Sequence, residues 1–183
     1  MELYEDRYAD KPLQLFVETL INEHYNTTEK LCASAKKQTE KISSLEIGES
    51  MSQYTLACNS IITETEQYIR ARKEKYIPYM LTLSQKADTQ HDCSTCTGSC
   101  KLNHDMQLLE LRASNELMQK TLKKLQIASL PLYSETIYAD EYRLLRSQMA
   151  MIETSLSELF FLENNYLIPK IQEAQKNINA GNY

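Results

Sequence analysis

The stretch Leu162–Ile171 reads LENNYLIPKI and combines a glutamate with an Ile-Pro pair inside a long amphipathic segment. This segment runs from about residue 137 to 180, with apolar residues at the spacing of a helix. Glu163 follows Leu159 on the same apolar stripe. A charged side chain on an inward face needs a partner. The stretch therefore predicts a helix that carries a buried carboxylate into the core.

Three further segments show the same helical spacing of apolar residues. They run from about Lys11 to Leu45, from after Gly48 to about Ala87, and from about Lys101 to Ile127. Short connections between long helices favour antiparallel neighbours. The sequence therefore predicts an all-α fold, an antiparallel up-down-up-down four-helix bundle. We expect one domain over residues 1–183, with a Cys-rich loop at 88–101 between two helical hairpins.

Two Ile-Pro pairs suggest a weak internal duplication. Arg72 stands six residues before Pro78, just as Glu163 stands six residues before Pro169. A proline inside a helix removes a hydrogen bond and costs roughly 3 kcal/mol, so two matched prolines favour a common origin. Two unrelated kinks are the alternative interpretation.

The stretch LENNYLIPKI, together with His104-Asp105, resembles the hemerythrin-like di-iron proteins, especially their iron–sulfur centre repair branch. The resemblance implies that each half supplies one histidine from its first helix and an HxxxE pair from its second. The corresponding positions in this chain are His24, Tyr68 and Arg72 in the first half, and His104, Leu159 and Glu163 in the second. Most of the iron ligands that the resemblance implies are thus replaced.

The residues at these positions predict an ion pair in place of a di-iron centre. A di-iron site needs several imidazoles and two carboxylates, which His24, His104 and Glu163 do not supply. Arg72 cannot be deprotonated and repels metal. We expect its guanidinium to pair with Glu163, with Tyr68 and His24 hydrogen-bonded around the pair. Two alternatives remain: a single metal on His24, His104 and Glu163, or an Arg72 side chain that extends to the surface.

A cluster of soft ligands precedes the third predicted helix. It contains His91, Cys93, Cys96 and Cys100. Thiolates at this spacing, completed by a histidine, can bind zinc or an iron–sulfur cluster. Free or redox-active thiols and a disulfide are the alternatives. The two other cysteines, Cys32 and Cys58, are expected as small core residues.

Composition limits the partners and the location. The chain has 183 residues and a net charge of −5, with lysine and arginine interspersed among acids, which argues against nucleic-acid binding. No apolar run is long enough for a bilayer, and the acidic N-terminus is unlike a signal peptide. We therefore expect a cytoplasmic protein without a membrane partner. A protein partner or a second copy of the chain stays open.

The sequence supports three functional hypotheses, and whether the chain is an enzyme stays open. The first is a ligand-depleted hemerythrin-like protein, a non-catalytic binding or stress-response protein whose Cys-rich loop is a metal or redox element. The second is an iron-binding relative with altered ligands, which the resemblance links to oxygen or nitric oxide response or to iron–sulfur centre repair. The third is a structural or interaction bundle without metal.

Overall fold

The computed structural model describes residues 7–45, 48–89, 99–130 and 140–180, without the side chains of residues 99–104, 179 and 180. These residues form four long helices, three of which contain a π-helical turn. The first consists of α2 (Leu13–Thr19), η1 (Leu20–Tyr25) and α3 (Asn26–Ile42), and the second of α4 (Glu49–Ala71), η2 (Arg72–Tyr76) and α5 (Ile77–Asp88). The third is α6 (Ser99–Ser129), and the fourth consists of α7 (Asp140–Leu162), η5 (Glu163–Leu167) and α8 (Ile168–Ala180).

The predicted all-α class is confirmed, because the described part of the chain is helical and contains no strand. The helices begin and end close to the positions that the apolar spacing predicts. The third helix begins slightly earlier than predicted, at Ser99. Cys100, which we expected in the Cys-rich loop at 88–101, therefore lies in the first turn of α6. His91, Cys93 and Cys96 lie outside the described residues.

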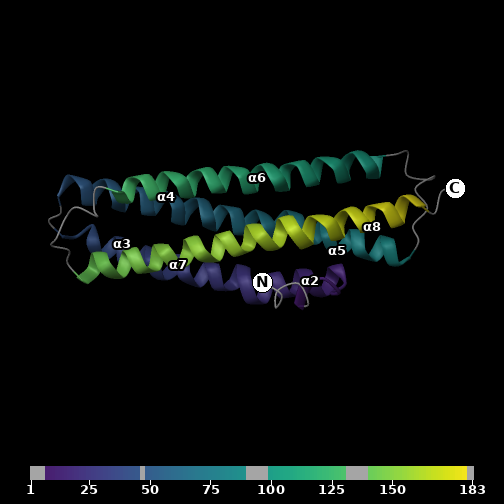
Figure 1. Cartoon of the computed structure of the whole chain (residues 1–183), viewed down its shortest axis with the longest axis horizontal. Helices are drawn as coiled ribbons and strands as arrows, with labels where there is room; N and C mark the ends of the chain where they lie inside the picture. The colour runs from purple at the N-terminus through teal and green to yellow at the C-terminus, as the bar shows by residue number, and fades with distance from the viewer. Residues whose placement is uncertain (1–6, 46–47, 90–98, 131–139, 181–183) are drawn as a thin grey trace.

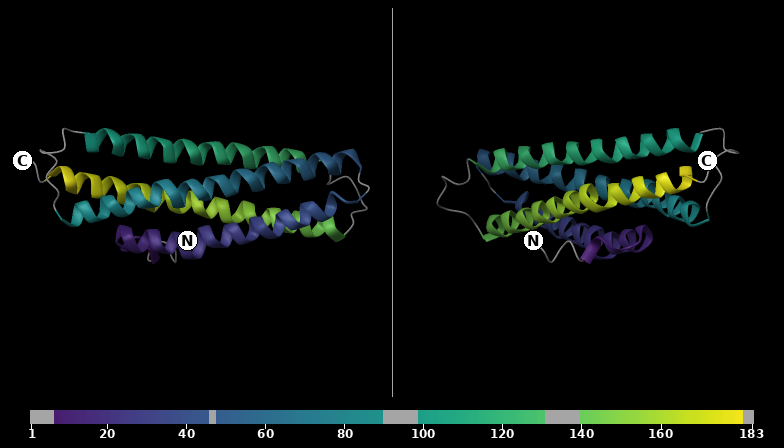
Figure 2. Two further views of the ribbon diagram at one scale, coloured as in Figure 1. Left: turned by 180° about the vertical axis from the view of Figure 1, so that it is seen from behind. Right: turned by 45° about the vertical axis from the view of Figure 1, so that its right-hand side comes forward.

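The four helices lie side by side along one long axis (Figures 1 and 2). The helix α3 packs closely against α4 and α7, α5 packs against α2 and α8, and α4 also packs against α6. Among the described helices, α6 packs most closely against α4. Its inward face is buried, with Leu111 and Leu125 exposing 1% and 4% of their surfaces.

One half of the bundle, formed by α3, α4 and α7, has an apolar core. Ile42, Ile61, Ile152 and Leu156 each expose 1% or less of their surface. Removing such a side chain from water stabilises the fold by about 1.5–3 kcal/mol. Cys58 lies in the same core, where burial raises the pKa of its thiol to about 12. The expectation that this cysteine and Cys32 are core residues is confirmed, since each is fully buried.

The π-helical turns η2 and η5 come directly before the two Ile-Pro pairs. The N–H of Ile77 donates to the carbonyl of Arg72, and the N–H of Ile168 donates to the carbonyl of Glu163, five residues back in each case. The wider turn relieves the contact between the proline ring and the carbonyl four residues earlier, which would kink a regular α-helix. The prolines are thus accommodated by an inserted residue.

Candidate functional site

The centre of the bundle contains a fully buried ion pair. The Nε of Arg72 lies 3.1 Å from Oε1 of Glu163, and its Nη2 lies 3.1 Å from Oε2. Both side chains are 0% exposed. Two parallel N–H···O bonds make this the bidentate geometry that is among the strongest for a carboxylate. The predicted pairing of Arg72 with Glu163 is therefore present, and Arg72 does not extend to the surface.

The remaining guanidinium donors of Arg72 point to the third helix. Its Nη2 donates to Oδ1 of Asn115 at 2.6 Å, and its Nη1 donates to Oγ of Ser114 at 3.3 Å. Its Cζ atom stands 4.1 Å from the ring centroid of Tyr68 and 5.0 Å from that of Tyr76. Burial is the largest single influence and lowers the pKa of Arg72, but the charge and hydrogen bond of Glu163, together with the neighbouring Tyr68 and Tyr25, outweigh it, so the net shift is upward. The guanidinium therefore stays charged.

Glu163 receives a further hydrogen bond from the first helix. The hydroxyl of Tyr25 donates to Oε1 of Glu163 at 2.7 Å. Burial, followed by the Glu163 charge, holds the pKa of Tyr25 well above its usual value, so this hydroxyl remains a donor. Each of the four long helices thus supplies at least one polar group, among them Tyr25, Arg72, Asn115 and Glu163.

The three π-helical turns lie at the level of this site. Arg72 begins η2, Glu163 begins η5, and Tyr25 ends η1. In η1 the buried positions Leu20 and Tyr25 are five residues apart, which matches the bond from the N–H of Asn26 to the carbonyl of Ile21. The wider turn therefore allows Tyr25 to face inward next to its buried neighbour His24. Single π turns inside α-helices are frequent at functional sites.

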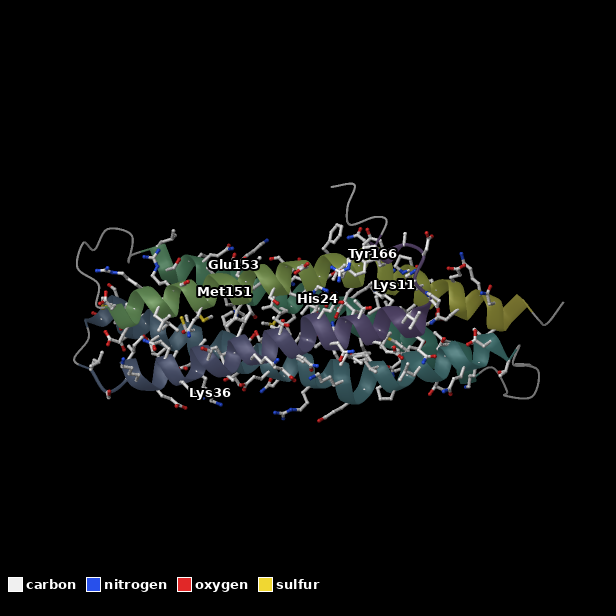
Figure 3. All side chains as sticks on the ribbon, turned by 90° about the horizontal axis from the view of Figure 1, so that it is seen from below. Lys11, His24, Lys36, Met151, Glu153 and Tyr166 are labelled. Atoms are coloured by element: carbon white, nitrogen blue, oxygen red, sulfur yellow. The ribbon has the colours of Figure 1, made fainter. Side chains whose placement is uncertain are left out.

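His24 does not take the predicted position beside the ion pair. Figure 3 shows it near the middle of the bundle's length. Its Nδ1 lies 3.8 Å from Oε2 of Glu158, and its Nε2 is buried without a hydrogen-bond partner. Burial lowers its pKa, which favours the neutral imidazole. The expectation of a His24 hydrogen bond to the pair is wrong, because the π turn gives that contact to Tyr25.

Of the other predicted pocket positions, Tyr68 and Leu159 lie at the level of the ion pair and His104 does not. Tyr68 faces the pair, and its hydroxyl donates to Oδ1 of Asn115 at 2.9 Å. Leu159 is 0% exposed, one turn before Glu163. His104 lies in α6 eleven residues before Asn115, which is about 16 Å along the helix axis. The residue at this level of the third helix is therefore Asn115.

These residues do not fit a di-iron centre. The pair has one carboxylate, Glu163, and its oxygens accept hydrogen bonds from Arg72 and Tyr25. The Arg72 guanidinium, which cannot be deprotonated, already pairs with this carboxylate and would repel a metal cation there. The same geometry argues against a single metal on His24, His104 and Glu163. Among the side chains that the structure describes, no group of three or more His, Cys, Asp or Glu could hold a metal ion.

Sequence reasoning missed Tyr25, Ser114 and Asn115 as site residues. Asn115 follows the inward stripe of its helix, so its burial at 2% exposure could be expected. Its position along the bundle axis, next to Arg72, could not be predicted, because that position depends on where α6 enters the bundle. Tyr25 had no sequence signal, since helical periodicity points to His24 at this turn.

A small surface pocket reaches the outer edge of the site. It has a volume of about 220 Å³ and is lined by α4 and α6 residues that include Tyr68 and Ser114. Both of these residues contact Arg72. The amide Nδ2 of Asn115 is buried without a partner in the same region. The pocket therefore lies next to two residues that contact Arg72, while the ion pair itself is 0% exposed.

Comparison of the chain with protein-family models, with curated proteins and with solved structures gave no match. The resemblance to hemerythrin-like proteins therefore rests on the sequence positions alone. In the described part of the chain, no helix combines the length and the apolar content that crossing a bilayer needs.

Proposed function

We propose that this chain is a hemerythrin-like, up-down-up-down bundle in which the Arg72–Glu163 ion pair stands in place of a di-iron centre. The bundle then acts as a non-catalytic binding or stress-response protein, with the Cys-rich segment as its metal or redox element. The observation that carries the proposal is the burial of the whole ion pair, with both side chains 0% exposed and joined by two 3.1 Å bonds.

The arrangement of the site supports this proposal. Ligand and metal sites of helix bundles are built from inward side chains on facing helices, and here every long helix contributes at least one polar group. Arg72 and Glu163 each begin a π-helical turn six residues before a proline, so the two halves match at this level. The guanidinium supplies the positive charge that the buried carboxylate requires. The pair therefore has a structural role, since neither group is accessible to a substrate.

The first experiment is elemental analysis of protein purified without oxygen, alongside a Cys93→Ser/Cys96→Ser/Cys100→Ser variant. We expect either metal in the wild type that the triple variant lacks, or no metal in either protein. Two irons per chain that survive the triple substitution would overturn the proposal and restore the iron-binding alternative.

A second experiment tests the correspondence of positions. The variant Tyr68→His/Arg72→Glu/Leu159→His recreates an HxxxE pair in each half. Both proteins carry Cys93→Ser/Cys96→Ser/Cys100→Ser, so that the Cys-rich segment cannot bind metal. We expect the variant to bind ferrous iron in its core and the protein with the three serines alone not to bind it. Absence of iron binding in a variant that is still helical by circular dichroism would contradict the correspondence. The variant Tyr68→Phe/Arg72→Met/Leu159→Met is the matched control, because it changes the same three positions without introducing any of the three new ligands.

A further inference from the structure

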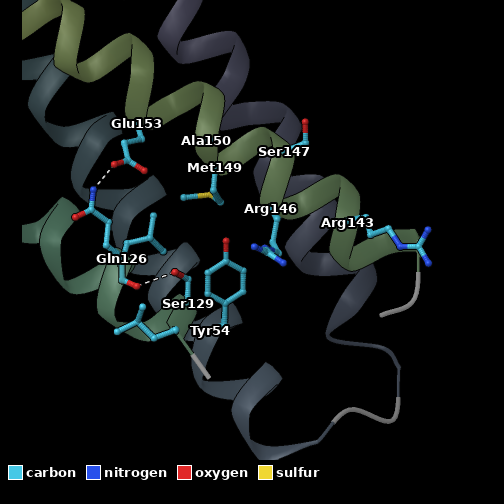
Figure 4. Close-up of a pocket in the computed structure, with 11 residues that line it drawn as sticks. Tyr54, Gln126, Ser129, Arg143, Arg146, Ser147, Met149, Ala150 and Glu153 are labelled. Atoms are coloured by element: carbon cyan, nitrogen blue, oxygen red, sulfur yellow. Dashed lines mark hydrogen bonds between the residues drawn. The ribbon is translucent and has the colours of Figure 1, made fainter. Parts of the chain in front are cut away.

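A cavity of about 580 Å³ lies between the C-terminal part of α6 and the N-terminal part of α7. Figure 4 shows its lining residues, which come from α4, α6 and α7. Binding sites for small molecules typically measure about 300–1,000 Å³. The cavity lies where α6 packs closely on α4 and stays further from α7. It is separate from the buried ion pair, and none of its lining residues contacts Arg72 or Glu163.

The floor of the cavity is apolar. Tyr54, Leu125 and Met149 expose 3%, 4% and 2% of their surfaces. Leu130 is 61% exposed and extends the apolar surface to the rim. In Figure 4 the hydroxyl of Tyr54 points into the cavity, between Met149 and Arg146. An apolar floor with a few convergent polar groups is the usual composition of a small-molecule site.

The two ends of the cavity carry opposite charges. Arg146, which is half-buried, lies at one end, and Arg143 lies one turn earlier, where it pairs with Asp140 at 3.4 Å on the surface. At the other end, the amide of Gln126 donates to Oε1 of Glu153 and bridges α6 and α7. Arg146 and Glu153 are seven residues apart, about 10 Å along α7. One anionic head group therefore fits at the Arg146 end, and a second would meet Glu153.

We propose that this cavity binds a small amphipathic anion, with one acidic head group at Arg146 and an uncharged apolar body over Leu125 and Met149. A medium-chain fatty acid has this chemistry. The planar guanidinium of arginine matches a carboxylate, and its weak hydration suits a partly buried site. Arg143 is offset by its pair with Asp140, so Arg146 is the lining arginine that would hold the head group. This inference goes beyond the proposed function and does not depend on it.

Isothermal titration calorimetry with decanoate, below its micelle concentration, tests the proposal. Decanol serves as the uncharged probe of equal chain length. We expect one decanoate per chain and at least tenfold weaker binding of decanol. Arg146→Ala is expected to weaken decanoate at least tenfold and leave decanol unchanged. Arg112→Ala, which removes an exposed arginine of α6 outside the cavity, is the matched control and is expected to bind decanoate like the wild type.

A second variant keeps the test decisive if Arg146→Ala does not fold. Ala150→Trp adds a large side chain at an exposed lining position and is expected to abolish binding of both probes. The proposal is overturned if decanoate does not bind saturably, if decanol binds equally well, or if Ala150→Trp leaves decanoate binding intact. Sedimentation with phosphatidylglycerol vesicles that requires Arg146, without binding of free decanoate, would assign the surface to a membrane and also overturn it.

Discussion

Two levels of the same bundle fill their interior with opposite chemistry. Where α3, α4 and α7 pack, the core contains apolar side chains such as Ile61, Ile152 and Leu156 on regular helices. At the level of η1, η2 and η5, it contains Arg72 and Glu163. Apolar contacts depend on the area removed from water, so many arrangements serve nearly as well. The polar level depends on directional bonds from all four helices, so it permits one register. The comparison predicts different responses to substitution at the two levels.

The largest effect is expected when the ion pair is broken from one side. Glu163→Leu leaves the Arg72 guanidinium buried with its main acceptor gone, and removing one partner of a buried pair costs about 3–5 kcal/mol. The double variant Arg72→Met/Glu163→Leu removes both charges and is expected to recover most of this loss. The free energy of unfolding from urea denaturation measures both. A double variant as unstable as the single one would contradict the assignment of the loss to the unpaired charge.

The matching change at the apolar level is Leu156→Ala. This side chain is 0% exposed, and truncating such a leucine costs about 2–5 kcal/mol. Removing a second side chain nearby is not expected to restore the loss, because the cost comes from an empty volume that only added apolar atoms refill. Combined with Arg72→Met/Glu163→Leu, its effect on urea denaturation is expected to add within about 0.5 kcal/mol. A strong departure from additivity would show that the two levels are coupled.

A smaller effect is expected from Tyr25→Phe, which removes one hydrogen bond to the carboxylate. Hydrogen bonds to charged groups contribute about 1.5–3 kcal/mol. Tyr79→Phe is the matched control, because the hydroxyl of Tyr79 accepts a bond from the neutral amide of Gln175. We expect about 1 kcal/mol or less for the control. Equal losses of unfolding free energy in the two variants would contradict a special contribution of Tyr25.

The smallest effect is a pH dependence at the edge of the polar level. Burial lowers the pKa of His24 from 6.5, so the unfolded chain binds a proton more readily than the folded one. The contribution of His24 to stability is therefore present above about pH 6.5 and is lost as the pH falls through 6.5 toward the lower folded pKa. Urea midpoints at pH 7.5 and pH 5.5 measure the change. His24→Gln is expected to flatten this dependence, and an unchanged slope would contradict it.

Sequence patterns predicted the apolar level more completely than the polar one. The spacing of Leu145, Ile152 and Leu156 is enough to assign a helix and its inward face. The inward positions of Arg72 and Glu163, and the need of a buried charge for a partner, also predicted the ion pair. Tyr25 escaped prediction because the π turn changes the phase of its helix. The role of Asn115 escaped because its level depends on how α6 enters the bundle, which its own periodicity does not encode.

Each of the π-helical turns η1, η2 and η5 adds one residue to its helix and rotates the residues after it by about 100° relative to an uninterrupted helix. The residues on the two sides of the polar level therefore belong to two different heptad frames. If the heptad positions of α7 are continued without a break into α8, the residues after Glu163 are assigned to the wrong face of the helix. A chimera that joins this bundle to another at the same level keeps both of its cores inward only if the three inserted residues are transferred with it.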